Sequence, residues 1–315
     1  MTKQHGVRAN LLLDFRANDW WAVLKRLFAN IQKHNLSLIS AGVAFYCLLA
    51  VFPLLAAIIS LYGIVVSQQE IQQHLAQFIN LFPQQSHYIV EEHLANFLKR
   101  SDSTLGWSFA VTLVVAIWGS SKGANALIQA CNITYSEPEN RSFIMGICVR
   151  IVCTVFMIAA IIFALLTISF LPLVLQEVTS TAINQTLASW LTWCMLFVFF
   201  NTCLAALYRY GPHRKSPKWR WVTPGSVLAT SLWLVASYAF NIYLSEFADY
   251  GSTYGSVGGV IILLIWLYFS ANIILTGAEL NAAIELQTVK DSTVGEDKPI
   301  GQRGAVVADN TPGTY

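Results

Sequence analysis

The sequence predicts an all-α fold, a polytopic membrane bundle of six transmembrane helices. Apolar residues make up 55% of the 315-residue chain and charged residues only 11%, against about 25% charged residues in ordinary soluble domains. Several apolar runs are also longer than the ~18 residues that indicate a membrane-spanning helix. Both observations argue against a soluble globular protein, so the spans and their orientation come first.

The six spans form a membrane domain over 38–285. We place them at residues 38–66, 105–131, 143–175, 183–208, 222–247 and 256–284. Residues 67–104 form the one long outer loop, and their apolar spacing predicts two short helices over the outer face of the bundle. The tail at 286–315 is polar and contains several glycines, which is typical of a disordered segment.

The distribution of basic residues sets the orientation. Of the 19 Lys and Arg residues, all except Lys99 and Arg100 fall on one side of the predicted spans. Loops rich in Lys and Arg stay in the cytoplasm, so both termini are expected there. The net charge of +2 is therefore an orientation signal, and we expect no nucleic-acid partner.

Residues 1–37 form a cytoplasmic N-terminus with an amphipathic segment. Within 17–34, one helical face carries Trp20, Leu24, Leu27 and Ile31, and the basic residues lie off that face. This pattern predicts an interfacial helix on the inner membrane surface. An anchor that only positions the first span explains the same pattern.

The last span combines small and polar residues. Gly251, Gly255 and Gly259 recur every four residues, a spacing that allows two helices to approach closely. A polar stripe follows on one helical face, formed by Tyr268, Asn272, Thr276 and Glu279. In the first span, Pro53 marks a position where that helix can bend and pack.

Four ionisable side chains fall near the inner edge of the membrane. Counting ~1.5 Å of rise per residue places Glu279, Lys122 and Arg150 at similar inner-leaflet depth, and Arg209 lies on the same side. Ion pairs among them would offset the cost of desolvation. We therefore expect these side chains to converge, although snorkelling of Lys122 and Arg150 to the interface is an equal alternative.

Other spans also carry polar side chains in their apolar runs. Joined to the stripe of the last span, they outline a polar track that ends at the inner charged cluster; they are Asn125, Asn201 and Asn241. A substrate path is one interpretation. Hydrogen bonding that holds the helices together is the other.

The sequence offers no cofactor or metal site. All six Cys lie within or at the ends of apolar spans and none forms a CxxC pair, so they are expected to be buried apolar residues. Metal-dependent RNA hydrolysis needs clustered ligands, whereas the cytoplasmic histidines His5, His34 and His213 are scattered along the chain. We therefore expect that the protein is not an enzyme and, in particular, not a nuclease.

Several motifs resemble one family of bacterial inner-membrane proteins. They are Trp118-Gly-Ser-Ser-Lys-Gly, Trp219-Arg-Trp-Val-Thr-Pro-Gly225, Tyr254-Gly-Ser-Val-Gly-Gly and Gly277-Ala-Glu-Leu-Asn281, and they are similar to those of the YihY/BrkB family. The resemblance covers residues 20–285 and implies six spans, cytoplasmic termini and an inner-membrane location. Members have been labelled ribonuclease BN or virulence factors, and transport, including lipid export, has been proposed for the family.

Two functions remain open from the sequence. The polar track favours a transporter or a lipid- or amphiphile-handling protein that acts on membrane lipids or an anionic substrate. The alternative is a non-transporting scaffold that binds an envelope or cytoplasmic partner, or a second copy of itself, through 67–104 or the N-terminal helix.

Overall fold

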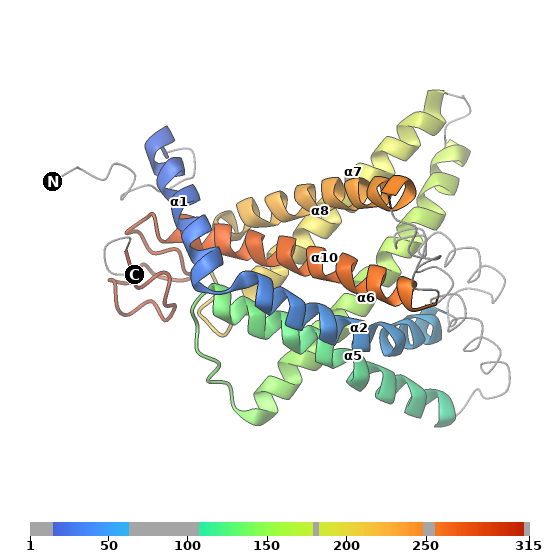
Figure 1. The fold of residues 1–315 in the computed structure, drawn as a ribbon, viewed down its shortest axis with the longest axis horizontal. Helices are drawn as coiled ribbons and strands as arrows, with labels where there is room; N and C mark the ends of the chain where they lie inside the picture. Colours follow the sequence, from blue (N-terminus) through green and yellow to red (C-terminus); the bar gives the residue numbers. More distant parts are fainter. Residues whose placement is uncertain (1–14, 63–106, 179–182, 248–255, 312–315) are drawn as a thin grey trace.

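The structure, a computed structural model, describes residues 15–62, 107–178, 183–247 and 256–311 (Figure 1). Seven helices are described, and no strand occurs in this part of the chain apart from an isolated bridge between Pro217 and Thr293. The helices are α1 (Ala17–Lys33), α2 (Leu36–Tyr62), α5 (Trp107–Thr134), α6 (Phe143–Val178), α7 (Ile183–Tyr210), α8 (Trp219–Phe247) and α10 (Ser256–Glu285). The all-α prediction is confirmed for these residues.

A helix occupies the described part of each of the six predicted spans. Within the described residues, α6, α7, α8 and α10 are long and apolar enough to cross a membrane, and α1 with α2 counts as a fifth span if the bent pair is taken as one. The 36 residues of α6 extend about 54 Å at the usual helical rise, well beyond a ~30 Å hydrocarbon core. This helix must therefore tilt or project from the membrane.

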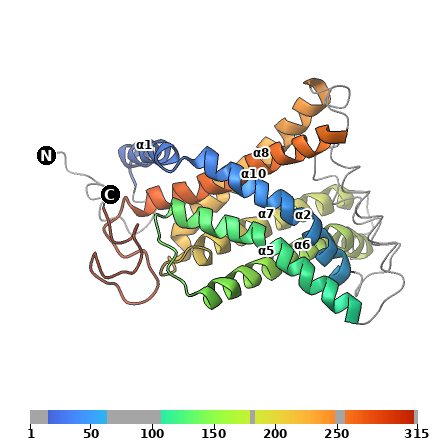
Figure 2. The ribbon, with the colours of Figure 1, turned by 60° about the horizontal axis from the view of Figure 1, so that its bottom comes forward.

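Consecutive helices form a closed ring. Each described helix from α2 to α10 packs on the next described one, and α10 closes the ring by packing on α2 (Figures 1 and 2). Exposed apolar side chains cover much of the outer surface of α6, α7 and α8, as expected for helices that face lipid. The helix α1 lies at the C-terminal end of α10 (Figure 1).

Glycines let α5 approach α2 closely. A Cβ added to Gly119 would lie 3.0 Å from the Pro53 ring, and one added to Gly123 would lie 3.1 Å from the Ala50 Cβ. This is a small-xxx-small contact, and it gives Pro53 the helix-packing position that the sequence suggested. Gly251, Gly255 and the 67–104 loop lie outside the described residues, whereas Gly259 is buried in α10.

The chain turns by 62° between α1 and α2. Asn35 makes this possible because it takes a left-handed conformation, with φ at 50°, which Asn tolerates better than most residues. The buried face of α1 carries Val23 and Leu27, which pack with Leu280 of α10. Leu24 is exposed. The apolar face predicted for this segment is therefore partly packed on α10 and partly exposed.

The C-terminal tail is packed as far as residue 311, in contrast to the predicted disorder. Leu286 and Val307 are buried in the main apolar cluster, and the Arg303 side chain donates hydrogen bonds to several backbone carbonyls, including those of Val289 and Ala308. Composition alone suggested disorder because the tail is polar, but a polar segment can be ordered when its charged groups satisfy the backbone.

Candidate functional site

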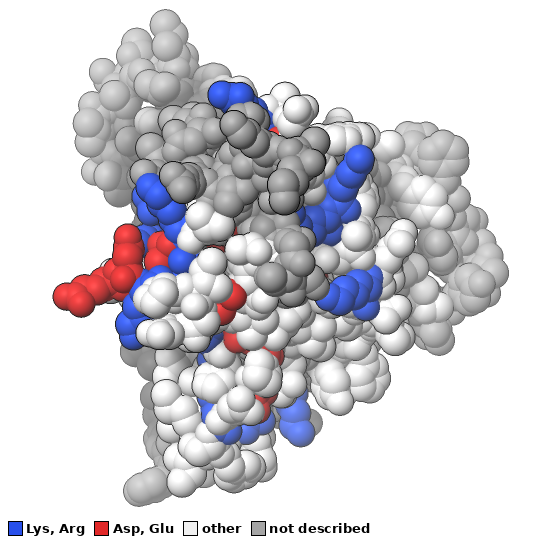
Figure 3. Space-filling model, turned by 90° about the vertical axis from the view of Figure 1, so that its left-hand side faces the viewer, with Lys and Arg blue, Asp and Glu red and all other residues white. Residues whose placement is uncertain are grey.

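The candidate site lies at the end of the bundle where α10 meets α1, the α5–α6 and α7–α8 connections and the tail (Figure 1). Lys and Arg side chains are spread around this end, as Figure 3 shows. The last turns of α10 contribute three buried polar side chains to it, which are Glu279, Asn281 and Glu285. Each binds a different neighbouring segment.

Glu279 pairs with the junction between α1 and α2. Its Oε1 lies 2.5 Å from His34 Nδ1, and the carboxylate is fully buried. The other imidazole nitrogen, Nε2, lies 3.4 Å from the Ser136 hydroxyl, just beyond α5. Asn30 and Lys33 of α1 also lie close enough to act on the Glu279 carboxylate.

Asn281 repairs the backbone of α8. Pro224 lies inside α8, where proline cannot donate to the helical ladder and disturbs the turn before it. The Gly225 N–H instead donates to Asn281 Oδ1 at 2.7 Å, and Asn281 Nδ2 donates to the Val222 carbonyl at 3.0 Å. One side chain of α10 therefore bonds two backbone groups of α8 next to Pro224.

The same crossing requires glycine on both helices. A Cβ added to Gly225 would run into the Gly277 carbonyl oxygen, and one added to Gly277 would lie 2.6 Å from both the Gly225 carbonyl oxygen and the Tyr208 hydroxyl. Tyr208 of α7 also donates a hydrogen bond to the Ile274 carbonyl at 2.7 Å. The helices α7, α8 and α10 are thereby locked together at this end.

Glu285 forms a buried ion pair with Arg214. The guanidinium donates twice to the carboxylate, at 3.0 and 2.5 Å, and the two side chains are 0% and 2% exposed. The Ser292 hydroxyl also donates to Glu285, and the guanidinium carbon lies 5.0 Å from the Tyr135 ring centre. Burial alone would lower the pKa of Arg214, but the adjacent Glu285 carboxylate outweighs it and raises the pKa above its usual value.

The predicted convergence of charges on Glu279 differs from the geometry. Lys122 is exposed, and Arg150 is half-buried with its Nε donating to the Gly146 carbonyl of its own helix at 3.3 Å. Within the described residues the ion-pair partner of Glu279 is His34. Counting residues along a helix estimates the depth of a side chain but not the direction in which it points. Residues at similar predicted depth can therefore face different neighbours.

Members of the predicted polar track take separate positions. Asn241 is exposed, and Asn125 and Tyr268 are half-buried. Asn201 accepts a hydrogen bond from Ser226, and Asn272 donates to Ser40 at 3.4 Å. The Thr276 hydroxyl bonds the Asn272 carbonyl within α10. Two of these contacts link helices, which is the bonding role that the sequence left open beside a path.

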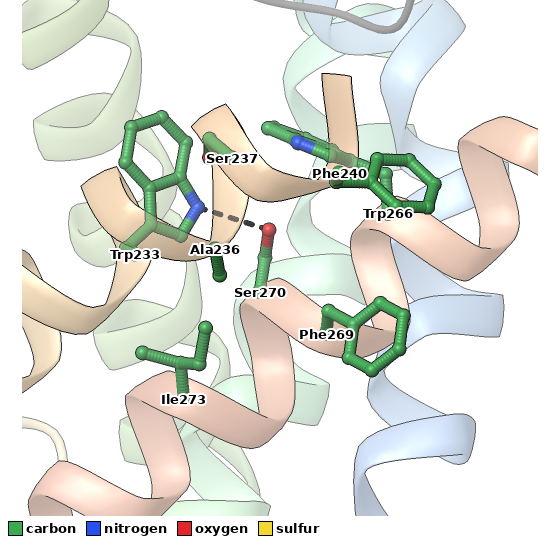
Figure 4. A pocket seen from close by; sticks show the side chains of 8 residues that line it. All are labelled: Trp233, Ala236, Ser237, Phe240, Trp266, Phe269, Ser270 and Ile273. Atoms are coloured by element: carbon green, nitrogen blue, oxygen red, sulfur yellow. Dashed lines mark hydrogen bonds between the residues drawn. The ribbon is translucent and has the colours of Figure 1, made fainter. Parts of the chain in front are cut away.

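A small hollow lies between α8 and α10, and none of the predicted track residues lines it (Figure 4). Trp233 and Trp266 contribute to its wall, and the Trp233 indole N–H donates to the Ser270 hydroxyl across it at 3.0 Å. Its volume of about 10 Å³ is enough for about one water molecule. The hollow admits a polar contact between the two helices and is too small for an organic substrate.

Arg209 lies apart from the buried pairs, in the last turn of α7. Its guanidinium carbon is 4.7 Å from the Trp219 ring centre and 5.2 Å from the Tyr210 ring centre. Two of its nitrogens, Nε and Nη1, are buried without a hydrogen-bond partner in the described residues. The side chain is half-buried.

Sequence reasoning missed three members of this end: His34, Asn281 and Arg214. His34 was treated as a scattered cytoplasmic residue, although its place immediately before a span puts it at interfacial depth. Asn281 and Glu285 are four residues apart and share a second helical face of α10, roughly opposite the stripe that ends at Glu279; the sequence analysis considered only the first face.

Comparison with known proteins places the chain in a family. The family model described as Virulence factor BrkB matches residues 27–300. The chain belongs to this family. The resemblance inferred from the motifs is therefore confirmed, and the chain is a membrane protein of the BrkB group.

Individual relatives agree. The ribonuclease-like protein YfkH of Bacillus subtilis is 33% identical over 270 residues, which cover 83% of this chain and 94% of YfkH. A UPF0761 membrane protein of Psychromonas ingrahamii is 25% identical over 84% of this chain and 89% of its own length. For a UPF0761 membrane protein of Psychrobacter, with 25% identity over 87% of this chain, the match spans only half of the relative. No solved structure matches the chain.

Proposed function

We propose that this BrkB-family chain is a six-span protein of the bacterial inner membrane with both termini in the cytoplasm. The hydrogen bonds of the candidate site bring residues near both ends of the chain and two connections to one end of the bundle. Those segments contain most of the basic residues, which favours the cytoplasmic side. Single-cysteine labelling from each side of oriented vesicles tests this: labelling of residue 140 from the outer side would contradict it.

Within that membrane, the proposed activity is transport or handling of an amphiphilic, anionic molecule. The observation that carries the proposal is Glu279, a fully buried carboxylate near the inner end of a candidate span, bonded to His34 at the junction between α1 and α2. Ionisable groups at membrane depth are costly and are usually retained for function. His34 and the Ser136 hydroxyl extend from this carboxylate toward the end of the bundle.

Neutralising Glu279 tests the proposal. Glu279→Gln in reconstituted vesicles is expected to reduce lipid scrambling or anion flux while the protein remains folded. Asp297→Asn is the matched control, because Asp297 is an acidic residue at the same end whose side chain is 75% exposed. Unchanged flux in folded Glu279→Gln protein would count against a transport path through this site.

The rival proposal is a scaffold, and the outer face of α1 favours it. Trp21, Leu24 and Phe28 are exposed at positions i, i+3 and i+7, so they form an apolar face in addition to the one packed on α10. The Lys25 ammonium lies 5.4 Å from the Trp21 ring centre. Replacing Trp21 and Phe28 by Ser would abolish partner recruitment by a scaffold, whereas a transporter would retain flux.

We also propose that the chain is not an enzyme. Although the Bacillus subtilis relative is named for likeness to a ribonuclease, the described residues contain no group of three His, Cys, Asp or Glu side chains placed to hold a metal ion. A metal-dependent nuclease requires such a group. Metal-stimulated cleavage of RNA by the purified protein, lost on His34→Ala or Glu279→Gln substitution, would overturn this proposal.

A further inference from the structure

Arg209 has donor groups for which the described residues supply no acceptor. Its Nε and Nη1 are buried and have no acceptor in the described residues. Arginine presents its N–H groups as a planar fork that matches a phosphate or carboxylate. A buried donor without an acceptor is rare in native proteins, so a partner beyond the described residues is expected.

Two aromatic rings frame this guanidinium. Trp219 and Tyr210 meet edge to face at 6.2 Å, and each ring lies close to the Arg209 guanidinium. The rings are 44% and 57% exposed, so one face of the frame opens away from the bundle. Trp and Tyr in such positions are typical of the membrane interface, where lipid headgroups lie.

An apolar strip leads away from Arg209 along α7. Thr202, Val198, Met195 and Leu191 are all exposed, and they precede Arg209 by 7, 11, 14 and 18 residues. These spacings place them on the same helical face as Arg209. Val198 lies about 16 Å along the axis from Arg209 at the usual helical rise, within the reach of a fatty acyl chain.

We propose that Arg209, with Trp219 and Tyr210, binds the phosphate headgroup of an anionic lipid whose acyl chain lies along the exposed face of α7. The site names a ligand class for the proposed amphiphile-handling function and in that respect rests on it. A free phosphate ion shares the headgroup chemistry but has no use for the apolar strip. The two sources are therefore separable by experiment.

The test measures lipid retained by the full chain in detergent. Native mass spectrometry compares phosphatidylglycerol with phosphatidylcholine of the same acyl chains. Arg209→Gln removes the fork and is expected to lower phosphatidylglycerol affinity about tenfold, because hydrogen bonds to charged groups are among the stronger ones. Arg209→Lys keeps the charge without the fork and is expected to fall between wild type and Arg209→Gln.

Arg220→Gln is the matched control. Arg220 is exposed in the first turn of α8, and its substitution removes the same charge from the same end of the bundle. It should leave phosphatidylglycerol binding within about twofold. Equal losses in Arg209→Gln and Arg220→Gln would reduce the effect to general charge and overturn the site. Loss of both lipids alike, or unchanged binding in both Arg209 variants, would overturn it as well.

Inorganic phosphate separates the two ligand sources. If it displaces phosphatidylglycerol at millimolar concentration and binds with the same dependence on Arg209, the site takes a free anion and the lipid assignment is wrong. Equilibrium binding is independent of flux. Lipid binding that depends on Arg209, with unchanged flux in both Arg209→Gln and Glu279→Gln, would retain the site and reject the transport proposal. Lipid binding that does not depend on Arg209, with reduced flux in Glu279→Gln, would reject the site alone.

Discussion

The buried pair between Arg214 and Glu285 should dominate the stability of the cytoplasmic end. Glu285→Gln leaves the guanidinium of Arg214 in a position where its side chain has no exposure. Removal of one partner from a buried pair costs about 3–5 kcal/mol because the remaining charge is uncompensated. Arg214→Met should cost a similar amount, although the Ser292 hydroxyl still donates to the Glu285 that remains.

A double-mutant cycle isolates the pair. Arg214→Met combined with Glu285→Met removes both charges, and such apolar replacements of buried pairs are often near neutral, so most of the lost stability should return. The free energy of unfolding is measured by SDS titration of the detergent-solubilised protein. Tryptophan fluorescence reports the transition because Trp221, at the start of α8, is fully buried near this end.

An exposed pair supplies the control. Lys218 and Asp297 lie 3.1 Å apart, but their side chains are 30% and 75% exposed. Asp297→Asn should therefore change stability by at most about 1 kcal/mol. If Glu285→Gln costs no more than Asp297→Asn, or if the double variant is no better than the singles, the Arg214–Glu285 pair contributes no more than an exposed pair and the expectation is refuted.

Three further results are expected. Gly225→Ala should destabilise the protein by about 1–3 kcal/mol or more, because the added methyl group meets the Gly277 carbonyl. Gly146→Ala is the control and should be neutral, because a Cβ added there has no atom within 4 Å. Equal SDS midpoints for the two variants would refute the close crossing of α8 and α10. Asn281→Leu leaves the Gly225 N–H and the Val222 carbonyl without their side-chain partner, which should cost about 1–3 kcal/mol for each group. Asn281→Asp keeps the acceptor for the Gly225 N–H and should retain part of the stability. An Asn281→Leu variant as stable as wild type would contradict this role of Asn281. Burial raises the pKa of Glu137 above its usual value, and the Val306 N–H and Arg214 only partly offset it. Its contribution to stability is therefore fully present below the unfolded pKa of about 4.3 and lost as pH rises through the folded value; Glu137→Gln should remove this slope from the pH dependence of unfolding, and an unchanged slope would exclude Glu137 as its source.

Hydropathy predicted the helices well because a membrane span depends on the sum of many side chains. The described helices α6, α8 and α10 begin or end within a few residues of the predicted spans. The direction of a single side chain depends instead on how its helix is rotated and packed against its neighbours, which hydropathy does not give. Lys122 was expected near Glu279, yet it is exposed and the structure pairs Glu279 with His34.

The partners of α10 were hidden for a related reason. Asn281 of α10 bonds to Gly225 of α8, 56 residues away in sequence, next to Pro224 in the second turn of α8. Arg214 meets Glu285 across 71 residues. Such pairs depend on how the helices are ordered around the ring, which the spacing of apolar residues within each helix does not contain.

The closed ring has a consequence for how the chain assembles during synthesis. Because neighbours in the ring are also neighbours in sequence, each helix can pack on its predecessor soon after both have entered the membrane, with little loop-closure cost. The contacts of α10 with α1, α2 and α5 are exceptions, since they must wait for the last helix. A ribosome stalled before residue 256 should therefore leave an open chain of helices whose α2 edge is accessible to chaperones or proteases, and release of α10 should remove that vulnerability in a single late step.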